Sequence, residues 1–368
     1  MVQFRFDSGT GTKKRMNLLF NQKNESMSTL AMKPSELKKA LEFAFIHNYP
    51  VLIKGQPGIG KSEIVESVWK KLGYDGIILH PVVSDPTDFK GMPWVVPTKT
   101  GTHEALFIPI GEMKRLLTAT KPLVVFIDDL GQATPAVQSA LMQLLLARKI
   151  NGHVISEHVR FVAATNRRED RANVAGILEP VKSRFASIIE LICDVDEWIT
   201  WAYENGLPSS INSFIQFRPK MLNNFQPTRD IENSPCPRTV TYAARMIRDG
   251  MPDEIRFKMV AGAAGELFAI EFETYMKVYR TLPSLTQIEN DPMGTMVPNE
   301  ISAQFALAGL IVEKMNRNNI GPFFQYLPRL GDELLVASMF NGSKRNPSVV
   351  STPEFNQFAV KYGHLILG

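Results

Sequence analysis

The sequence predicts an α/β fold, in which a parallel central sheet is flanked by helices, followed by a helical region. Short apolar runs alternate with amphipathic runs between residues 33 and 193, the pattern of successive strand–helix–strand units. Several of the apolar runs end in polar or glycine residues, which in parallel sheets mark the edge where ligands bind. From residue 194 onward the apolar residues keep helical spacing. We therefore expect a sheet-based core and then helices.

A glycine-rich loop is the most specific motif. It fits the pattern G-x-x-x-x-G-K-[ST] at every fixed position with Gly55-Gln56-Pro57-Gly58-Ile59-Gly60-Lys61-Ser62. An apolar run at 49–53 precedes the loop and an amphipathic run beginning at Glu63 follows it. Strand, loop and helix in this order distinguish a P-loop from a glycine-rich turn without a ligand. The fold class is therefore predicted to be that of an α/β P-loop NTPase.

The P-loop residues predict a site for ATP and Mg²⁺. Backbone N–H groups from Gly55 to Glu63, together with the start of the next helix, form an anion-binding nest for the triphosphate. Lys61 reaches the β- and γ-phosphates, and the Ser62 hydroxyl is a ligand for Mg²⁺.

Two further apolar runs end in polar residues with predicted roles. Leu123 to Ile127 is followed by Asp128 and Asp129, which places both acids at the carboxyl end of a buried parallel strand. We assign Mg²⁺ binding, directly or through water, to Asp128, and orientation of the attacking water to Asp129. The alternative is that Asp128 only caps the next helix. The run 159–164 leads to Asn166, whose amide is predicted to sense the γ-phosphate or position water, the alternative being a turn residue.

Composition excludes few function classes. The 368 residues carry 41 basic and 37 acidic side chains, a net charge of +4, which is too mild to indicate nucleic acid by itself. The two cysteines, Cys193 and Cys236, lack C-x-x-C spacing, so neither a disulfide framework nor a zinc cluster is indicated. No apolar run approaches the ~20 residues of a membrane span. We predict a cytoplasmic protein.

The chain is predicted to divide into four parts. Residues 205–237 contain many Asn and Pro and are expected to be loose. Within the core, Trp94 and Phe107 lie on a predicted hairpin and are expected to pack against its base rather than contact a partner. The four predicted parts of the chain are a flexible N-terminal arm (1–32), an α/β core (33–193) with an insert hairpin at about 84–109, a helical part (194–252) and a helical C-terminal region (253–368).

The order of the motifs resembles that of the AAA+ ATPases. P-loop, acidic strand end, Asn-tipped strand and the arginine of Lys182-Ser183-Arg184-Phe185 follow one another. The detail is closest to the MoxR-like family of the helix-2-insert group. The hairpin after Ser84-Asp85-Pro86-Thr87-Asp88, a second hairpin at 149–158 and the segment 128–141 carry this likeness. The resemblance is strong over about residues 33–250 and weak beyond.

The resemblance implies roles for two arginines and makes 194–252 a helical lid. Arg184 is similar to the arginine finger, which acts on nucleotide bound to the neighbouring subunit, and Arg238 to the second sensor at the start of a lid helix. Arginine suits both roles because its planar fork of donors stays charged. A solvated surface charge is the alternative for each. Arg167, Arg168 and Arg171 compete with Arg184 for the role in trans.

The implied function is Mg²⁺-dependent hydrolysis of ATP by a homo-oligomeric ring, of six subunits, that remodels a protein partner in a chaperone-like way. The resemblance suggests a partner with a von Willebrand factor A domain. Asp129 departs from the family, which has Glu at this position. An ATP-gated assembly module with little turnover therefore stays open as an alternative, as does a DNA-acting ATPase related to clamp loaders or helicases.

Overall fold

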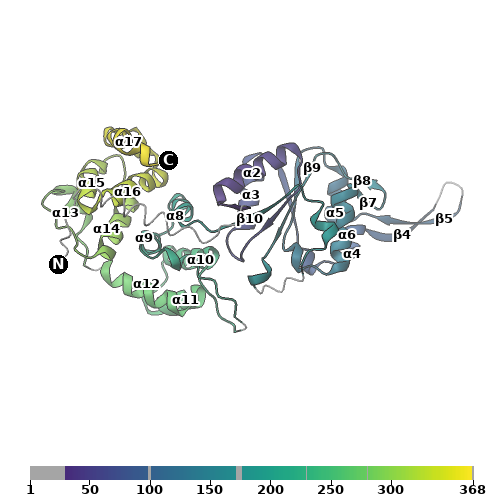
Figure 1. Ribbon diagram of the computed structural model, residues 1–368, viewed down its shortest axis with the longest axis horizontal. Helices are drawn as coiled ribbons and strands as arrows, with labels where there is room; N and C mark the ends of the chain where they lie inside the picture. The colour runs from purple at the N-terminus through teal and green to yellow at the C-terminus, as the bar shows by residue number, and fades with distance from the viewer. Residues whose placement is uncertain (1–29, 98–100, 171–175, 229, 280, 367–368) are drawn as a thin grey trace, which may run out of the picture.

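The computed structural model describes residues 30–97, 101–170, 176–228, 230–279 and 281–366. The described residues form a sheet-based core and a helical region, which lie side by side and are joined after strand β10 (Figure 1). This arrangement confirms the α/β P-loop fold with a parallel central sheet and a helical C-terminal region. No helix among the described residues is long and apolar enough to cross a membrane.

The central sheet has six strands in the order β1-β10-β2-β9-β6-β3, and every neighbouring pair is parallel. Their bounds are Ala31–Met32 (β1), Val51–Lys54 (β2), Asp75–Leu79 (β3), Leu123–Ile127 (β6), Val159–Thr165 (β9) and Ser187–Leu191 (β10). Because β2, β9 and β6 are consecutive, the residues that follow them meet at one edge. The P-loop follows β2, Asn166 follows β9 and Asp128 follows β6.

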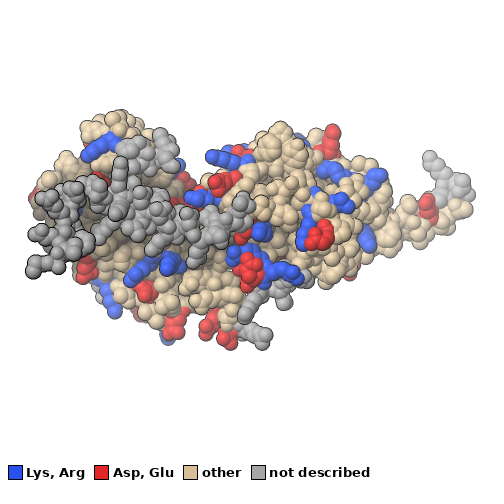
Figure 2. All heavy atoms as spheres, viewed as in Figure 1, with Lys and Arg blue, Asp and Glu red and all other residues tan. Residues whose placement is uncertain are grey.

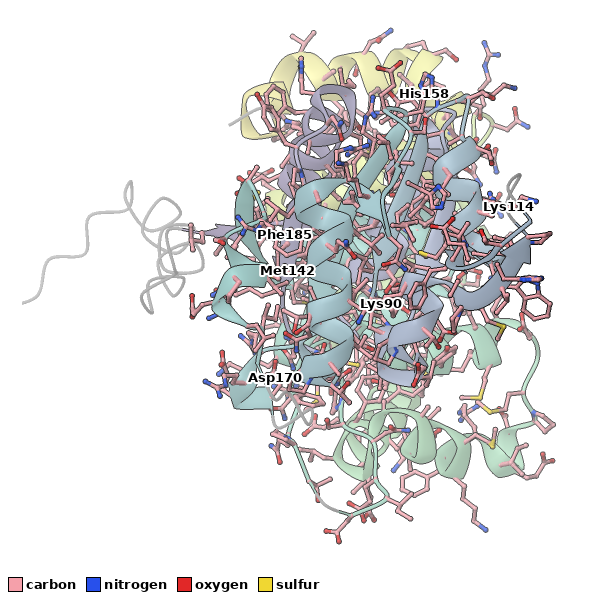
Figure 3. The ribbon with its side chains drawn as sticks, turned by 90° about the vertical axis from the view of Figure 1, so that its right-hand side faces the viewer. Lys90, Lys114, Met142, His158, Asp170 and Phe185 are labelled. Carbon is pink, nitrogen blue, oxygen red and sulfur yellow. The ribbon has the colours of Figure 1, made fainter. Side chains whose placement is uncertain are left out.

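Helices cover both faces of the sheet, which explains why its central strands are apolar on both sides. On one face Val124 and Phe126 of β6 pack with α2 (Pro34–His47) and α3 (Lys61–Lys71). On the other face Val125 and Ile127 pack with α5 (Gly111–Thr118) and α6 (Pro135–Ala147). Figure 3 looks from this second side, with Met142 of α6 and Phe185 labelled.

Two small antiparallel hairpins leave the core. One pairs β4 (Met92–Pro97) with β5 (His103–Ile108) after the short helix α4 (Pro86–Lys90), and the other pairs β7 (Lys149–Ile150) with β8 (His153–Val154). The expected packing of Trp94 and Phe107 is wrong. Trp94 pairs with Leu106 and Phe107 with Pro93, so the two rings lie on opposite faces, and they are 60% and 42% exposed.

The first strand also departs from the prediction. Ala31 and Met32 were assigned to the flexible arm, whereas in the structure they pair with Glu190 and Leu191 of β10 as the edge strand β1. The backbone hydrogen bonds of this pairing hold the chain in place before α2 begins. Residues 1–29 of the predicted arm lie outside the described residues.

The remaining helices form two apolar clusters. The first contains residues of α8, α9, α10, α11, α12 and α14, and the second contains residues of α13 to α17. The bounds of these helices are Val195–Glu204 (α8), Ser209–Phe217 (α9), Pro237–Arg248 (α10), Asp253–Ala264 (α11), Glu266–Tyr279 (α12), Leu285–Asn290 (α13), Ile301–Lys314 (α14), Ile320–Tyr326 (α15), Asp332–Arg345 (α16) and Pro353–Ile366 (α17). The short helix α7 (Glu179–Lys182) precedes β10 and belongs to the sheet-based core, where its Val181 is buried.

Helix α9 corrects the expectation that 205–237 is loose throughout. Phe214 is fully buried and makes edge-on contacts with Phe268 and Phe272 of α12. Ser213 is buried as well, and its hydroxyl lies 2.9 Å from that of Tyr279. The Ser213 hydroxyl also donates to the carbonyl oxygen of Ser209 at 2.6 Å, and a buried hydroxyl is tolerated in a helix when it has such partners.

Candidate nucleotide-binding site

The P-loop has the backbone that a phosphate cradle needs. Gly58 and Gly60 have φ of +75° and +94°, a conformation that glycine adopts at little cost. A Cβ atom at Gly58 would lie 2.5 Å from Sγ of Cys236, so no side chain fits there. Gly60 is the N-cap of α3, so the positive end of that helix points at the loop, as anion sites require.

Lys61 is buried and fully hydrogen-bonded. Its Nζ donates to the carbonyl oxygens of Gly55 (2.9 Å) and Gln56 (3.0 Å) and to Oδ1 of Asn166 (2.8 Å). These three acceptors match the three donors of an ammonium group. Burial lowers the pKa of Lys61 to about 8, although the nearby charges of Asp129 and Asp128 act in the opposite direction.

The oxygen atoms that fit Mg²⁺ lie next to the P-loop lysine. Oγ of Ser62 donates a hydrogen bond to Oδ2 of Asp128 at 2.8 Å, and Oδ1 of Asp128 accepts one from the backbone N–H of Asp129 at 3.0 Å. A hydroxyl and a carboxylate at hydrogen-bond distance are a donor set of the hard-oxygen kind that Mg²⁺ prefers. These two side chains therefore fit the ion.

Asp129 sits in a strained and partly desolvated position. Its φ of +53° lies in the left-handed region, which Asp adopts more readily than most residues. Its Oδ1 accepts a hydrogen bond of 3.1 Å from Nδ2 of Asn166. Burial, and then the negative charge of Asp128, raise the pKa of the Asp129 carboxyl. Asn166 thus joins Lys61 to Asp129 through the two ends of one amide.

The helical region is hydrogen-bonded to the P-loop. The backbone N–H of Arg238, in the first turn of α10, donates to the carbonyl oxygen of Gly58 at 2.9 Å. Nδ2 of Asn223 donates to Oε1 of Gln56, also at 2.9 Å. Two P-loop residues are therefore held directly by the predicted lid, although the side-chain contact of Asn223 was not expected from the sequence.

A cavity of about 230 Å³ lies between the P-loop and the helical region. Arg238, Tyr242 and Arg245 of α10 line it from one side, and their i, i+4, i+7 spacing places them on one helix face. Trp198 and Trp201 of α8 contribute aromatic surface, which suits a flat base. Arg238 is the one of these residues that the sequence predicts for the site. The positions of Tyr242 and Arg245, four and seven residues after Arg238, were a usable signal for two of the others. Further lining residues are Pro34, Lys38, Ile59, Glu63, Cys193 and Thr241.

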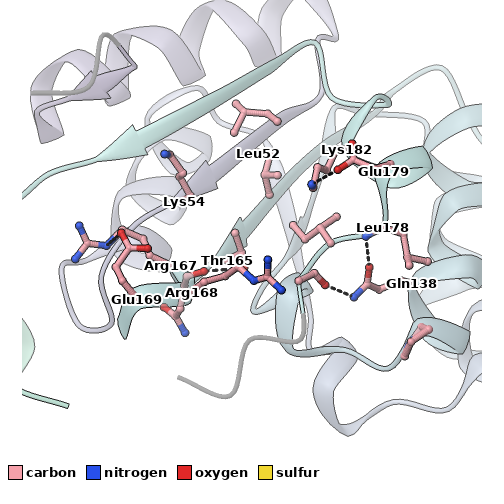
Figure 4. A pocket seen from close by; sticks show the side chains of 15 residues that line it. Leu52, Lys54, Gln138, Thr165, Arg167, Arg168, Glu169, Leu178, Glu179 and Lys182 are labelled. Carbon is pink, nitrogen blue, oxygen red and sulfur yellow. Dashed lines mark hydrogen bonds and ion pairs between the residues drawn. The ribbon is translucent and has the colours of Figure 1, made fainter. Parts of the chain in front are cut away.

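A second cavity, of about 540 Å³, borders Asn166 on another side (Figure 4). Among its basic residues, Arg167 binds Asp170 through two hydrogen bonds of 3.0 and 2.8 Å. Lys182 pairs with Glu179. Arg168 is exposed and has no ion pair among the described residues. Arg171, the remaining competitor for a role in trans, lies outside the described residues.

Arg184 is not brought to the P-loop of its own chain by any contact between described residues. Its side chain is half-buried, and its Nε is buried without a hydrogen-bond partner among those residues. The next residue, Phe185, is buried in the core, which fixes the backbone at this point. Action in trans stays a prediction.

The pKa of Lys61 gives a test of its role in binding. The ammonium form attracts the anionic triphosphate, and its fraction falls as the pH rises through about 8. The affinity for ATP is therefore expected to weaken by about tenfold between pH 7.5 and pH 9. Calorimetric titration at several pH values measures it. A Lys61→Met variant is the control, because its residual binding should not change over this range.

A family model and several solved structures are similar to this chain. Residues 50–185 match the family model described as AAA domain (dynein-related subfamily). No curated protein sequence matches the chain. Among solved structures, a mutant of RuvB from Thermotoga maritima has 17% identity over 80% of this chain and 86% of its own, with a TM-score of 0.40. NtrX from Brucella abortus has 13% identity over 88% and 69%, with a TM-score of 0.35. The family match runs from Pro50, just before β2, to Phe185, so this part of the chain is similar to AAA domains, and its sheet has the P-loop NTPase fold.

Proposed function

We propose that this protein hydrolyses ATP to ADP and phosphate with the help of Mg²⁺. The supporting observation is one hydrogen-bonded group of side chains at the carboxyl edge of β2, β9 and β6. It contains Lys61, Ser62, Asp128, Asp129 and Asn166. When bound between Ser62 and Asp128, Mg²⁺ supplies positive charge to the phosphate oxygens. AAA domains in general are nucleotide-hydrolysing modules, which agrees with this assignment.

The hydrogen bonds describe how nucleotide changes the site. Lys61 exchanges its carbonyl and amide acceptors for phosphate oxygens, which are stronger partners because they are charged. Asn166 then loses its bond to Lys61 and keeps its Nδ2 for Asp129 or for water. Asp129 accepts a hydrogen bond from the attacking water and so orients it. The water oxygen bonds to the γ-phosphorus while the bond from that phosphorus to the bridging oxygen breaks. The electron pair of the broken bond leaves with ADP, and one proton of the water passes to an oxygen of the released phosphate.

We further propose a ring in which Arg184 of one subunit serves the nucleotide of the next, with Arg238 acting from the lid. The resemblance to MoxR-like ATPases and the absence of a contact between described residues that would tie Arg184 to its own P-loop support this. A closed ring, of six subunits by resemblance, satisfies every heterologous interface. Its output is chaperone-like remodelling of a protein partner, and a von Willebrand factor A domain is the partner we suggest from the same resemblance.

A second candidate is an ATP-gated assembly switch with little turnover. Asp129 favours it, because its carboxylate is one methylene shorter than that of Glu and is already bonded to Asn166 at 3.1 Å. Such a site binds ATP without aligning water well.

Substitutions at Asp129 separate the two candidates. For an ATPase, Asp129→Asn is expected to lower turnover by about 100-fold or more while ATP affinity is retained, because the water loses its negatively charged carboxylate acceptor. Asp129→Glu is the companion variant. Steady-state phosphate release and nucleotide titration measure both. A wild type without turnover that Asp129→Glu activates would show that the chain is a switch.

A further inference from the structure

The β4–β5 hairpin carries several large apolar side chains that are exposed. It extends away from the sheet (Figure 1) and pairs with no third strand among the described residues. Isolated two-stranded ribbons are marginally stable in water, and contiguous apolar surface marks interaction sites. Six large apolar side chains are each 40% to 60% exposed, namely Met92, Trp94, Val95, Leu106, Phe107 and Ile108.

The two edges of this ribbon differ. Pro93 pairs with Phe107, Val95 with Ala105 and Pro97 with His103. Proline has no N–H to give to its partner strand, so these pairs belong to the set whose backbone groups face outward. The outer edge of β4 therefore lacks two of its three donors, which is how natural sheets block strand addition.

The outer edge of β5 keeps all of its backbone donors and acceptors. In the same register its outward-facing residues are His103, Ala105 and Phe107, and each carries both an N–H and a C=O. Three residues at alternate positions are the spacing that an added strand uses. A free edge of this kind is the template for β-strand addition by a peptide.

The charges on the two strands of the hairpin indicate which kind of ligand can bind to it. Residues 92–97 and 103–108 contain no Lys or Arg and one acid, Glu104. On the face drawn in Figure 2 the described part of the hairpin is tan apart from an acidic side chain. Nucleic acid and anionic lipid are disfavoured, because both require basic residues. Insertion into lipid would also leave the edge unsatisfied. We propose that the outer edge of β5 binds an extended, largely uncharged segment of a partner protein as a third strand.

The blocked edge also keeps copies of the chain apart. This step rests on the proposed ring. In such a ring the hairpins of neighbouring subunits are related head to tail. Pairing them would place β5 of one copy against β4 of the next. Pro93 and Pro97 prevent that pairing. The edge of β5 is therefore left for a foreign segment.

The test uses the full chain and an array of decapeptides in which apolar and uncharged polar residues alternate. Wild-type protein is expected to bind a subset. The strongest binder is then made again with methyl groups on alternate backbone nitrogens, which removes the donors of strand pairing. Its affinity is expected to fall at least about tenfold, since several hydrogen bonds of about 1 kcal/mol each are lost.

A matched pair of proline variants locates the site. Ala105→Pro removes the central donor of the β5 edge and is expected to weaken binding at least about tenfold. Val95→Pro lies directly opposite in the register, on the edge that prolines already block, and is expected to leave binding within about twofold. The methylated peptide keeps the test decisive if Ala105→Pro distorts the hairpin, because that arm leaves the protein unchanged.

Four results would overturn the proposal: no peptide bound, equal loss in both proline variants, no effect of methylation, or binding to phosphatidylcholine–phosphatidylglycerol vesicles in place of peptides. ATP turnover of the wild type is measured in parallel. A chain that binds peptides at β5 without hydrolysing ATP would contradict the proposed function and still support this inference.

Discussion

Lys61→Met is expected to weaken ATP binding at least about 100-fold and to abolish turnover while the protein stays folded. The ammonium is the charged group at the centre of the site, and it bonds Gly55, Gln56 and Asn166 at 2.8 to 3.0 Å. In the bound state these bonds are replaced by charge-assisted bonds to phosphate. Such bonds contribute about 1.5–3 kcal/mol each. Losing them should weaken ATP binding at least about 100-fold.

The fold should tolerate this change because two effects of similar size oppose each other. Burial lowers the pKa of Lys61 from 10.5 to about 8, which corresponds to a cost of about 3 kcal/mol for keeping the charge. Methionine removes that cost and also removes three hydrogen bonds, at about 1 kcal/mol each. The melting temperature is therefore expected to change by only a few degrees.

Titration with ATP and a thermal melt, carried out side by side, measure the two expectations. Lys71→Met is the matched control, since Lys71 lies on the same helix and its side chain is 67% exposed. It should bind and hydrolyse ATP like the wild type. If Lys61→Met bound ATP as tightly as Lys71→Met does, the P-loop would not be the nucleotide site.

The core could be predicted because local rules and tertiary contacts agree there. All five residues of β6 are apolar and buried, so the run predicts a strand with both faces covered. The two acids that follow it mark its carboxyl end. Gly58 and Gly60 of the P-loop have a positive φ that few other residues tolerate. Where backbone geometry dictates residue type so strongly, the pattern alone indicates the structure.

Other features depend on partners that are remote in sequence. Helix α9 is buried because aromatic rings of α12 cover Phe214, and composition cannot reveal that contact. The bonds that Asn166 makes to Lys61 and to Asp129 require the order β2-β9-β6. The register places Trp94 opposite Leu106, on the face away from Phe107, so the two rings do not pack against each other. In each case the residues can be read from the sequence, but the residues that they contact in the folded chain cannot.

Arg184→Ala is expected to lower turnover in assembled protein by about 1000-fold and leave ATP affinity nearly unchanged. An arginine supplied in trans stabilises charge that develops during phosphoryl transfer, and such residues contribute factors of this size. The position favours this role over a cis role. Phe185 anchors the backbone in the core, and no contact between described residues leads from Arg184 back to its own P-loop. Arg168→Ala is the control, because Arg168 is exposed and borders the cavity beside Asn166.

Mixing two inactive variants tests whether Arg184 acts between subunits. Arg184→Ala has an intact Lys61, and Lys61→Met has an intact Arg184. In a mixed ring some interfaces combine the intact Lys61 of one subunit with the intact Arg184 of its neighbour, so turnover should reappear when the two are combined. If Arg184 acted within its own chain, no interface would contain both groups and the mixture would stay inactive. The same mixture is made with Arg168→Ala in place of Arg184→Ala. If only that mixture recovered turnover, the finger would be Arg168, which is exposed.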